Sequence, residues 1–360
     1  MKLKYALIGC GRIAPNHIKA AKEQNLDIVA LCDLFIEKTE SLAHQFDLPK
    51  TVHTYTDYQK MLHIDRPNLI AIATESGEHA KIAFACIEAG CNLIIEKPIA
   101  LSLTDADAII EKADEKNVLV CACHQNRFNK SIQIIREQIE AGSFGKLFYG
   151  TAQIRWNRGE SYYKQAPWRG TWDQDGGALM NQCIHNIDLL RWMLGDEIME
   201  VNGITDNLSH PYMETEDFGA AFLKFKNGSY GIIEGTVNVY PRNLEESLSI
   251  FGEKGTVIVA GKSVNQIKVW NFTDEQLSLK EIEDKYNENP PTIYGYGHSP
   301  LYADVIEAII DHRPPYVTAT DGRRALELVL AIYQSASVGK SIRLPLKNGS
   351  TMDYKGRFST

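Results

Sequence analysis

The chain has 360 residues, of which 44% are hydrophobic, and it carries a formal net charge of −8. This length exceeds what one hydrophobic core usually supports, so we expect two domains. The acidic balance argues against a nucleic-acid partner. No stretch approaches the roughly 18 uninterrupted apolar residues of a membrane helix, so we expect no membrane partner.

The seven cysteines predict a reducing, cytoplasmic environment. Their number is odd and most lie within apolar runs, which is typical of buried, reduced thiols. The first ten residues run directly into a strand and a glycine turn, so we expect no signal peptide. Cys121-Ala-Cys123-His124 lacks a second ligand pair at finger-like spacing. We therefore expect no metal.

Short apolar runs alternate with helical patterns through the first third of the chain. The expected strands are Tyr5–Cys10, Ile28–Asp33, Leu69–Thr74, Asn92–Glu96 and Val118–Cys123. The expected helices are Asn16–Gln24, Glu37–Phe46, Glu78–Ala89 and Asp105–Lys116. This alternation is typical of a parallel sheet covered on both faces by helices. Residues 1–124 are therefore predicted to form one α/β domain.

Beyond His124 the segments become longer and alternate between apolar and polar residues, as in an antiparallel sheet. The expected strands are Lys146–Trp156, Ile198–Leu208, Asp217–Lys226, Ser229–Asn238, Glu245–Phe251 and Thr256–Ala260. The expected helices are Ser131–Ala141, Ala178–Leu194, Leu301–His312 and Gly322–Val338. Asn227-Gly228 is a strong hairpin signal. Residues 125–360 are predicted to form a second α/β domain.

The first strand leads into a dinucleotide-binding pattern, Gly9-Cys-Gly11-Arg12-Ile13-Ala14. Gly9 permits a tight turn, Gly11 lets a diphosphate approach the backbone, and the following helix offers its N–H groups to the phosphates. Asp33 ends the second strand 22 positions after Gly11, close to the expected spacing of about 20. Its carboxylate suits the ribose hydroxyls of NAD and repels the 2′-phosphate of NADP. The alternative is a phosphate-free turn with an exposed aspartate.

Two further loops follow strands that end at the same sheet edge, where ligands bind in parallel α/β sheets. Thr74 and His79 are candidate cofactor neighbours, and the alternative is a helix cap with an exposed histidine. Glu96-Lys97-Pro98 ends the next strand, where proline stops the ladder. We expect this Lys97–Pro98 bond to be cis, which would aim Lys97 into the ligand crevice at this sheet edge. The alternative, a surface ion pair, fits this location poorly.

The predicted helix from Ala178 follows Gly176-Gly177 and carries polar side chains on one face. Asn181 and His185 are four residues apart, so they share that face. Asp188 lies three residues further and could contact His185. A histidine on an apolar helix is usually structural, but here two polar groups lie together behind glycines that permit close backbone approach.

An aromatic and basic segment spans residues 155–169. Four basic residues interleave with four aromatic ones: Arg155, Trp156, Arg158, Tyr162, Tyr163, Lys164, Trp168 and Arg169. Aromatic rings stack on sugars or bases, and arginines bind carboxylates or phosphates. The alternative is a solvated surface loop.

Together, the glycine turn, Glu96-Lys97-Pro98 and the glycine-led helix bearing His185 resemble the Gfo/Idh/MocA oxidoreductases. The resemblance covers nearly the whole chain. It implies an N-terminal Rossmann domain, a C-terminal α/β domain with a large open, mainly antiparallel sheet, and a homodimer or homotetramer built on those sheets. It also implies that Lys97 and His185 are catalytic. Many members have an aspartate where this chain has Asn181. The amide of Asn181 can position a hydroxyl but cannot take a proton.

The resemblance implies further site residues. Trp168 and Arg169 would lie beside the nicotinamide, which leaves Arg155, Arg158, Tyr163 and Lys164 for the substrate. Glu96, Lys97 and Asn126 are further expected cofactor neighbours, and Asn126 is also a candidate sugar contact. Asn181, Lys97 and His185 would meet the substrate. In the implied reaction, His185 takes the proton of a sugar hydroxyl, Lys97 hydrogen-bonds the same oxygen, and hydride moves to NAD.

The sequence is most similar to family members that act as sugar-nucleotide 3-dehydrogenases. These oxidise UDP-N-acetylglucosamine-type sugars, including UDP-N-acetylglucosaminuronate, for surface polysaccharides. An anionic substrate fits the basic segment. The first alternative is an NAD-dependent inositol or free-sugar dehydrogenase. The second is a non-catalytic NAD-binding regulator, which intact Lys97 and His185 argue against.

Overall fold

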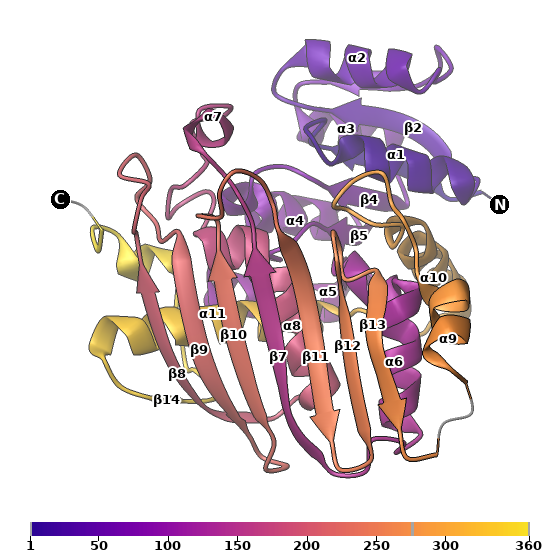
Figure 1. Cartoon of the computed structure of the whole chain (residues 1–360). Helices are drawn as coiled ribbons and strands as arrows, with labels where there is room; N and C mark the ends of the chain where they lie inside the picture. Colours follow the sequence, from indigo (N-terminus) through magenta and orange to yellow (C-terminus); the bar gives the residue numbers. More distant parts are fainter. Residues whose placement is uncertain (1, 275–276, 359–360) are drawn as a thin grey trace. The chain divides into compact units, whose positions relative to one another are not determined.

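The computed structural model describes residues 2–274 and 277–358, which form two compact units (Figure 1). The first unit runs to His124 and resumes over His298–Arg323. The second comprises Gln125–Gly297 and the segment from Arg324. The expected division placed all of residues 125–360 together. It missed that α10 (His298–Asp311) buries Leu301 and Tyr302 and packs against α1 (Ala14–Glu23) of the first unit.

The first unit contains a parallel six-stranded sheet in the order β3-β2-β1-β4-β5-β6. Its strands are β1 (Lys4–Ile8), β2 (Asp27–Cys32), β3 (His53–Tyr55), β4 (Leu69–Ile72), β5 (Asn92–Ile95) and β6 (Val120–Ala122). Besides α1 and α10, its helices are α2 (Ile36–Gln45), α3 (Tyr58–Asp65), α4 (His79–Glu88) and α5 (Leu103–Lys116). This is the Rossmann order, in which the connections reverse direction between β1 and β4.

The second unit is built on an eight-stranded sheet in the order β13-β12-β11-β7-β10-β9-β8-β14 (Figure 1). β7 and β10 are parallel, and all other neighbours are antiparallel. The strands are β7 (Leu147–Arg155), β8 (Ile198–Asp206), β9 (Phe218–Phe225), β10 (Tyr230–Thr236), β11 (Glu245–Gly252), β12 (Gly255–Gly261), β13 (Gln266–Phe272) and β14 (Ile342–Arg343). The predicted fold class is confirmed.

Helices cover one face of this second sheet. They are α6 (Lys130–Glu140), α8 (Ile184–Leu194), α9 (Leu279–Tyr286) and α11 (Ala319–Val338), whereas α7 (Glu160–Tyr163) is a single helical turn outside this layer. Helix α8 packs on β7, β10 and β11, and all its residues except His185 are buried. Alternate residues of β7, such as Ala152 and Ile154, are buried on this side.

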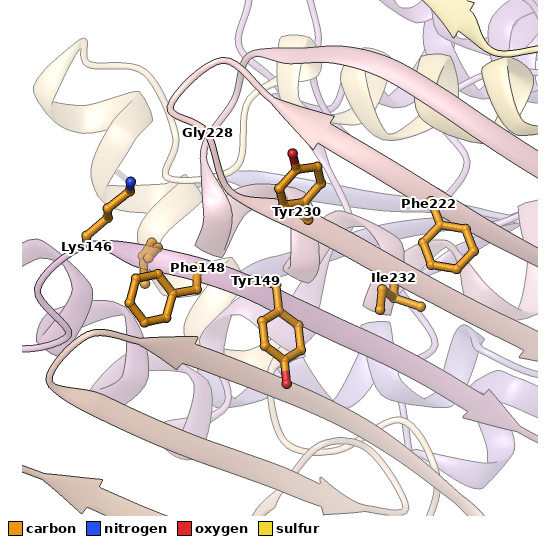
Figure 2. A pocket seen from close by; sticks show the side chains of 8 residues that line it. Lys146, Phe148, Tyr149, Phe222, Gly228, Tyr230 and Ile232 are labelled. Carbon is orange, nitrogen blue, oxygen red and sulfur yellow. The ribbon is translucent and has the colours of Figure 1, made fainter.

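The opposite face of the sheet carries exposed aromatic and apolar side chains on three adjacent strands. We call this the open sheet face and define it by Tyr149 of β7, Tyr230 and Ile232 of β10, and Phe222 of β9. Phe222 is 64% exposed and Tyr230 is 53% exposed. Figure 2 shows these side chains lining a shallow pocket. Among the helices of the described residues, none is both long and apolar enough to cross a membrane.

Candidate active site

The turn after β1 has the backbone that the glycine pattern predicts. Gly9 has φ +95°, and a Cβ there would lie 2.4 Å from the backbone of Ala73, at the end of β4. A Cβ on Gly11 would meet nothing within 4 Å. Gly9 is therefore required by contact with the neighbouring strand, while Gly11 leaves the space that a diphosphate needs. Arg12 is exposed and Ile13 precedes the first turn of α1.

Asp33 lies at the end of β2, directly beside this turn. Its carboxylate accepts hydrogen bonds from the backbone N–H groups of Cys10 at 2.8 Å and Phe35 at 3.0 Å. Lys38 lies 3.6 Å from the same carboxylate. The aspartate is thus fixed by the glycine turn itself, in the position from which a dinucleotide-binding fold holds the adenosine ribose.

His79 joins the loops that follow β4 and β5. The ring is 1% exposed, with Nδ1 2.8 Å from the Pro98 carbonyl and Nε2 3.2 Å from the Thr74 carbonyl. Burial lowers the pKa of His79, so the neutral ring donates one hydrogen bond, which the shorter distance assigns to Pro98. The alternative of an exposed histidine is wrong. The side chain lies beneath the two loops and fixes Thr74 relative to Pro98.

The expected cis Lys97–Pro98 bond is confirmed. Lys97 is half-buried, whereas the preceding Glu96 is buried and lies 3.1 Å from Nε2 of His17. Burial alone raises the pKa of Glu96, but the hydrogen bond from His17 and the nearby ring of His298 hold it well below its usual range. Glu96 is therefore an ionised anchor within the first unit, one residue before Lys97.

His17, Glu96 and His298 each offer a ligand atom, and these atoms lie within 4.8 Å of one another. Nε2 of His17 faces Glu96, and Nδ1 lies 2.7 Å from the hydroxyl of Tyr302. Both ring nitrogens of His17 therefore have protein partners, whereas the ring nitrogens of buried His298 have no hydrogen-bond partner among the described atoms, and its Nε2 lies 3.6 Å from Glu96.

In the second unit, the Gly176-Gly177 turn packs against a buried carboxyl group. A Cβ on Gly177, where φ is +106°, would lie 2.2 Å from Glu216 Oε2 and 2.6 Å from the Tyr333 hydroxyl. Burial raises the pKa of Glu216 to about 8, against the opposing effect of hydrogen bonds from the Leu179 N–H and the Tyr333 hydroxyl. The glycine is thus required by close approach to Glu216, which the sequence did not reveal.

The helix that carries His185 begins with a π-helical segment, Leu179–Cys183, before α8. Asn181 lies in this segment, and both Asn181 and His185 are half-buried. Asp188 is fully buried and accepts two hydrogen bonds of 2.7 Å from Arg127. This ion pair joins α8 to the segment after β6, a partner for Asp188 that the spacing did not indicate.

The start of this helix is connected to the aromatic and basic segment by side-chain hydrogen bonds. Arg158 donates to Gln182 at 3.0 Å, and Gln182 donates to Asn181 at 2.9 Å and to the Tyr162 hydroxyl at 3.1 Å. Arg169 also donates to that hydroxyl and stacks on both Tyr162 and Trp168. Gln182 and Tyr162 were not among the expected site residues.

Three other expected substrate residues have different partners. Arg155 alternates onto the open sheet face, where it forms two 2.8 Å hydrogen bonds with Glu234. Lys164 is exposed and pairs with Glu160 within one helical turn. Tyr163 is 6% exposed and its ring packs on His210 and Tyr212. Spacing along the chain could not separate these residues from Arg158, because the segment turns between them.

Asn126 lies in a short 3₁₀ turn directly after the first unit. It is 3% exposed, and its Oδ1 has no hydrogen-bond partner within the described protein atoms. A buried amide oxygen without a partner is uncommon, so it suits a ligand contact. Asn126 therefore remains a candidate for cofactor or sugar binding.

Comparison with known proteins agrees with this geometry. The NAD-binding Rossmann fold of the Gfo/Idh/MocA oxidoreductases matches residues 3–124, and the C-terminal α/β domain of the same family matches residues 136–344. The chain belongs to the Gfo/Idh/MocA oxidoreductase family. Among its named relatives, myo-inositol 2-dehydrogenase of Thermotoga maritima is 23% identical, over 95% of this chain and 98% of its own. The scyllo-inositol 2-dehydrogenase of Bacillus subtilis is 22% identical over 97% and 98%.

Two solved structures are more similar to this chain than these relatives are. WlbA dehydrogenase of Bordetella pertussis, in complex with NADH and UDP-GlcNAcA, is 34% identical with a TM-score of 0.86, and the match covers 96% of this chain and 100% of that one. WlbA of Chromobacterium violaceum, with the same ligands, is 32% identical with a TM-score of 0.87 over 96% and 97%. The protein is an NAD-dependent oxidoreductase of the sugar and polyol dehydrogenase type, and the regulator alternative is not supported.

Proposed function

We propose that this enzyme oxidises the C3 hydroxyl of a UDP-linked N-acetylamino sugar, such as UDP-N-acetylglucosaminuronate, to a ketone. The observation that carries the proposal is the likeness to the two WlbA structures, at 32–34% identity over nearly the full length of both chains. The inositol dehydrogenases match over similar lengths at only 22–23%. The supply of 3-oxo sugars for surface polysaccharides would be its role.

Within this proposal, Lys97 and His185 act on one substrate hydroxyl. NAD⁺ supplies the hydride acceptor when bound. His185 takes the hydroxyl proton, which suits an imidazole because its pKa lies near neutrality. Lys97 donates a hydrogen bond to the same oxygen and stabilises the charge that develops there. Asn181 cannot take a proton, so the general base is assigned to His185.

Arg158, Arg169, Trp168 and Asn126 are proposed to contact cofactor or sugar nucleotide. Their support is the hydrogen-bonded and stacked network around Tyr162 and the unpaired oxygen of Asn126. Arg155, Tyr163 and Lys164 are not carried forward as substrate contacts, because they lie in an ion pair, in the core and on an exposed helical turn, respectively.

A second candidate function is oxidation of an uncharged polyol, because inositol dehydrogenases match almost the whole chain. Calorimetric titration of the NAD-loaded protein separates the two. UDP-N-acetylglucosaminuronate and UDP-N-acetylglucosamine are expected to bind, with UDP alone contributing much of the affinity, and myo-inositol is not. Binding of myo-inositol without binding of UDP would move the enzyme to the free-polyol group and leave the Lys97 and His185 chemistry intact.

We also infer that the enzyme is a homodimer or homotetramer joined through the open sheet face. The support is an apolar surface on three adjacent strands, since such patches mark protein interfaces. A reducing compartment such as the cytoplasm suits the seven buried free cysteines.

Replacing Phe222 by aspartate is expected to shift the enzyme to a smaller assembly, because a charge on the open sheet face would lose its water on association. Light scattering coupled to size-exclusion chromatography measures the mass. Ile310 of α10 is 65% exposed and outside this face, so Ile310→Asp is the matched control. An unchanged mass for Phe222→Asp would place the interface elsewhere.

A further inference from the structure

Four side chains of the second unit form a continuous hydrogen-bonded row. Nε of Arg158 donates to Oε1 of Gln182 at 3.0 Å, and Nε2 of Gln182 donates to Oδ1 of Asn181 at 2.9 Å. Nδ2 of Asn181 then donates to Oδ1 of Asp175. We call these four residues the polar row. It connects the aromatic and basic segment to the first turn of the helix that carries His185.

The two ends of the polar row determine its direction. A guanidinium group only donates hydrogen bonds and an ionised carboxylate only accepts them. The amides of Gln182 and Asn181, placed between such ends, are satisfied in one orientation only. Each then receives a hydrogen bond on its oxygen and donates one from its nitrogen. Rotating either amide by 180° would place N–H against N–H or oxygen against oxygen.

Asp175 is built into the protein as a carboxylate. It is 3% exposed, and its Oδ2 accepts a 2.7 Å hydrogen bond from the backbone N–H of Gly170. Burial raises the pKa of both Tyr163 and Glu216, and the nearby charge of Asp175 raises both further.

We propose that Asp175 is a positioning residue of the active site, which acts through Asn181 to orient the polar side chains at the start of the His185 helix. The effect of this positioning on substrate turnover rests on the proposed function, but the pairing of Asp175 with Asn181 does not. In this chain, Asp175 supplies the carboxylate of the pair and Asn181 supplies the amide. An aspartate at position 181 would face a second carboxylate rather than a donor.

Asn181→Asp is the sharpest test, because it places two carboxylates in hydrogen-bond contact. Two such groups share one proton, and the pKa of one of them rises by roughly three units. The variant is therefore expected to keep its kcat/KM near pH 6 and to lose about tenfold per pH unit once that proton leaves. Wild type lacks this loss, and the single Asp175→Asn variant, which keeps an acceptor oxygen, loses less and without the new pH dependence.

The double variant Asp175→Asn/Asn181→Asp exchanges the two groups and is the matched rescue. The amide introduced at position 175 would donate to the carboxylate introduced at position 181. That carboxylate would still accept from Gln182, so the hydrogen bonds from Arg158 to position 181 keep their direction and only the last one, between positions 181 and 175, is reversed. Most of the kcat/KM lost by Asn181→Asp is expected to return at pH 8. A merely structural role, met by any polar pair, would not produce this pattern of pH-dependent loss and rescue.

Denaturant unfolding of the NAD-loaded proteins tests the pair without any sugar. A carboxyl whose folded pKa is raised stabilises the fold at low pH, and that stability is lost as pH rises through the folded pKa. The unfolding free energy of Asn181→Asp should thus fall relative to wild type between pH 5 and 8, and the double variant should not show this fall. If Asn181→Asp folds at no pH, recovery of folding by the double variant supports the pair.

The proposal is overturned if Asn181→Asp has the wild-type pH dependence in both assays, or if the double variant is no better than Asn181→Asp. Failure of the proposed function has a different signature. Wild type would then turn over none of the UDP sugars, while the unfolding curves of the three variants would still report on the pairing of Asp175 with Asn181.

Discussion

Replacing Lys97 by methionine is expected to lower kcat by about 10²–10³-fold, the usual effect of removing a donor to the oxygen that gains charge in the transition state. Methionine keeps the length and apolar stem of the side chain and removes only the ammonium group. NAD binding should be retained, because the glycine turn and Asp33 are separate from Lys97. Stopped-flow absorbance of NADH and calorimetric titration with NAD measure the two quantities.

Lys60 provides the matched control for this variant. It lies exposed in α3 of the same unit, so Lys60→Met should leave both kcat and NAD affinity unchanged. Unchanged turnover in Lys97→Met would remove Lys97 from the reaction. Lost NAD binding in the same variant would instead show that Lys97 serves the cofactor.

Replacing His185 by asparagine is expected to lower kcat by about 10²–10⁴-fold, because the variant lacks a general base. The side chain keeps hydrogen-bonding capacity and a similar volume, so the half-buried position on α8 should tolerate it. In wild type, kcat/KM should fall as pH drops through the pKa of the base. That acidic limb should disappear in His185→Asn, leaving a flat and low profile.

The measurement is the pH dependence of kcat/KM for both proteins, with His63→Asn as the control. His63 is exposed in α3 and should behave as wild type. If kcat/KM of His185→Asn equals that of wild type and still falls at low pH, the base is another group.

Secondary structure was predictable wherever apolar periodicity was strong. The five strands and four helices expected in the first third are present, with their ends moved by a few residues. β3 was missed because its three residues are polar and mostly exposed, which leaves no alternation to detect. β13 and α9 were also missed, because β13 breaks its alternation and α9 buries only Ile282. Neither gives the pattern of a buried face.

The site was predictable where one residue type has one use. Gly9, Gly11 and Asp33 follow from the geometry of a dinucleotide turn, and the structure places them together. Buried polar partners were not predictable in this way. Asp175 and Glu216 act on the helix start from six residues before Asn181 and from a distant loop, and no local spacing connects them.

The aromatic and basic segment shows the same limit. Arg155 and Arg158 are three residues apart, yet one is paired with Glu234 on the open sheet face and the other with Gln182. Composition indicated a binding segment but not which of its side chains lie on the open sheet face instead, since that depends on where β7 ends.

The most direct test of the account uses UDP-N-acetylglucosaminuronate that carries deuterium at C3, incubated with the enzyme and NAD⁺. Mass spectrometry of the NADH formed reports which carbon lost its hydride. We predict that NADH appears and carries the deuterium. Unlabelled NADH would show that another carbon is oxidised, and the absence of NADH, with turnover of myo-inositol under the same conditions, would contradict the sugar-nucleotide assignment.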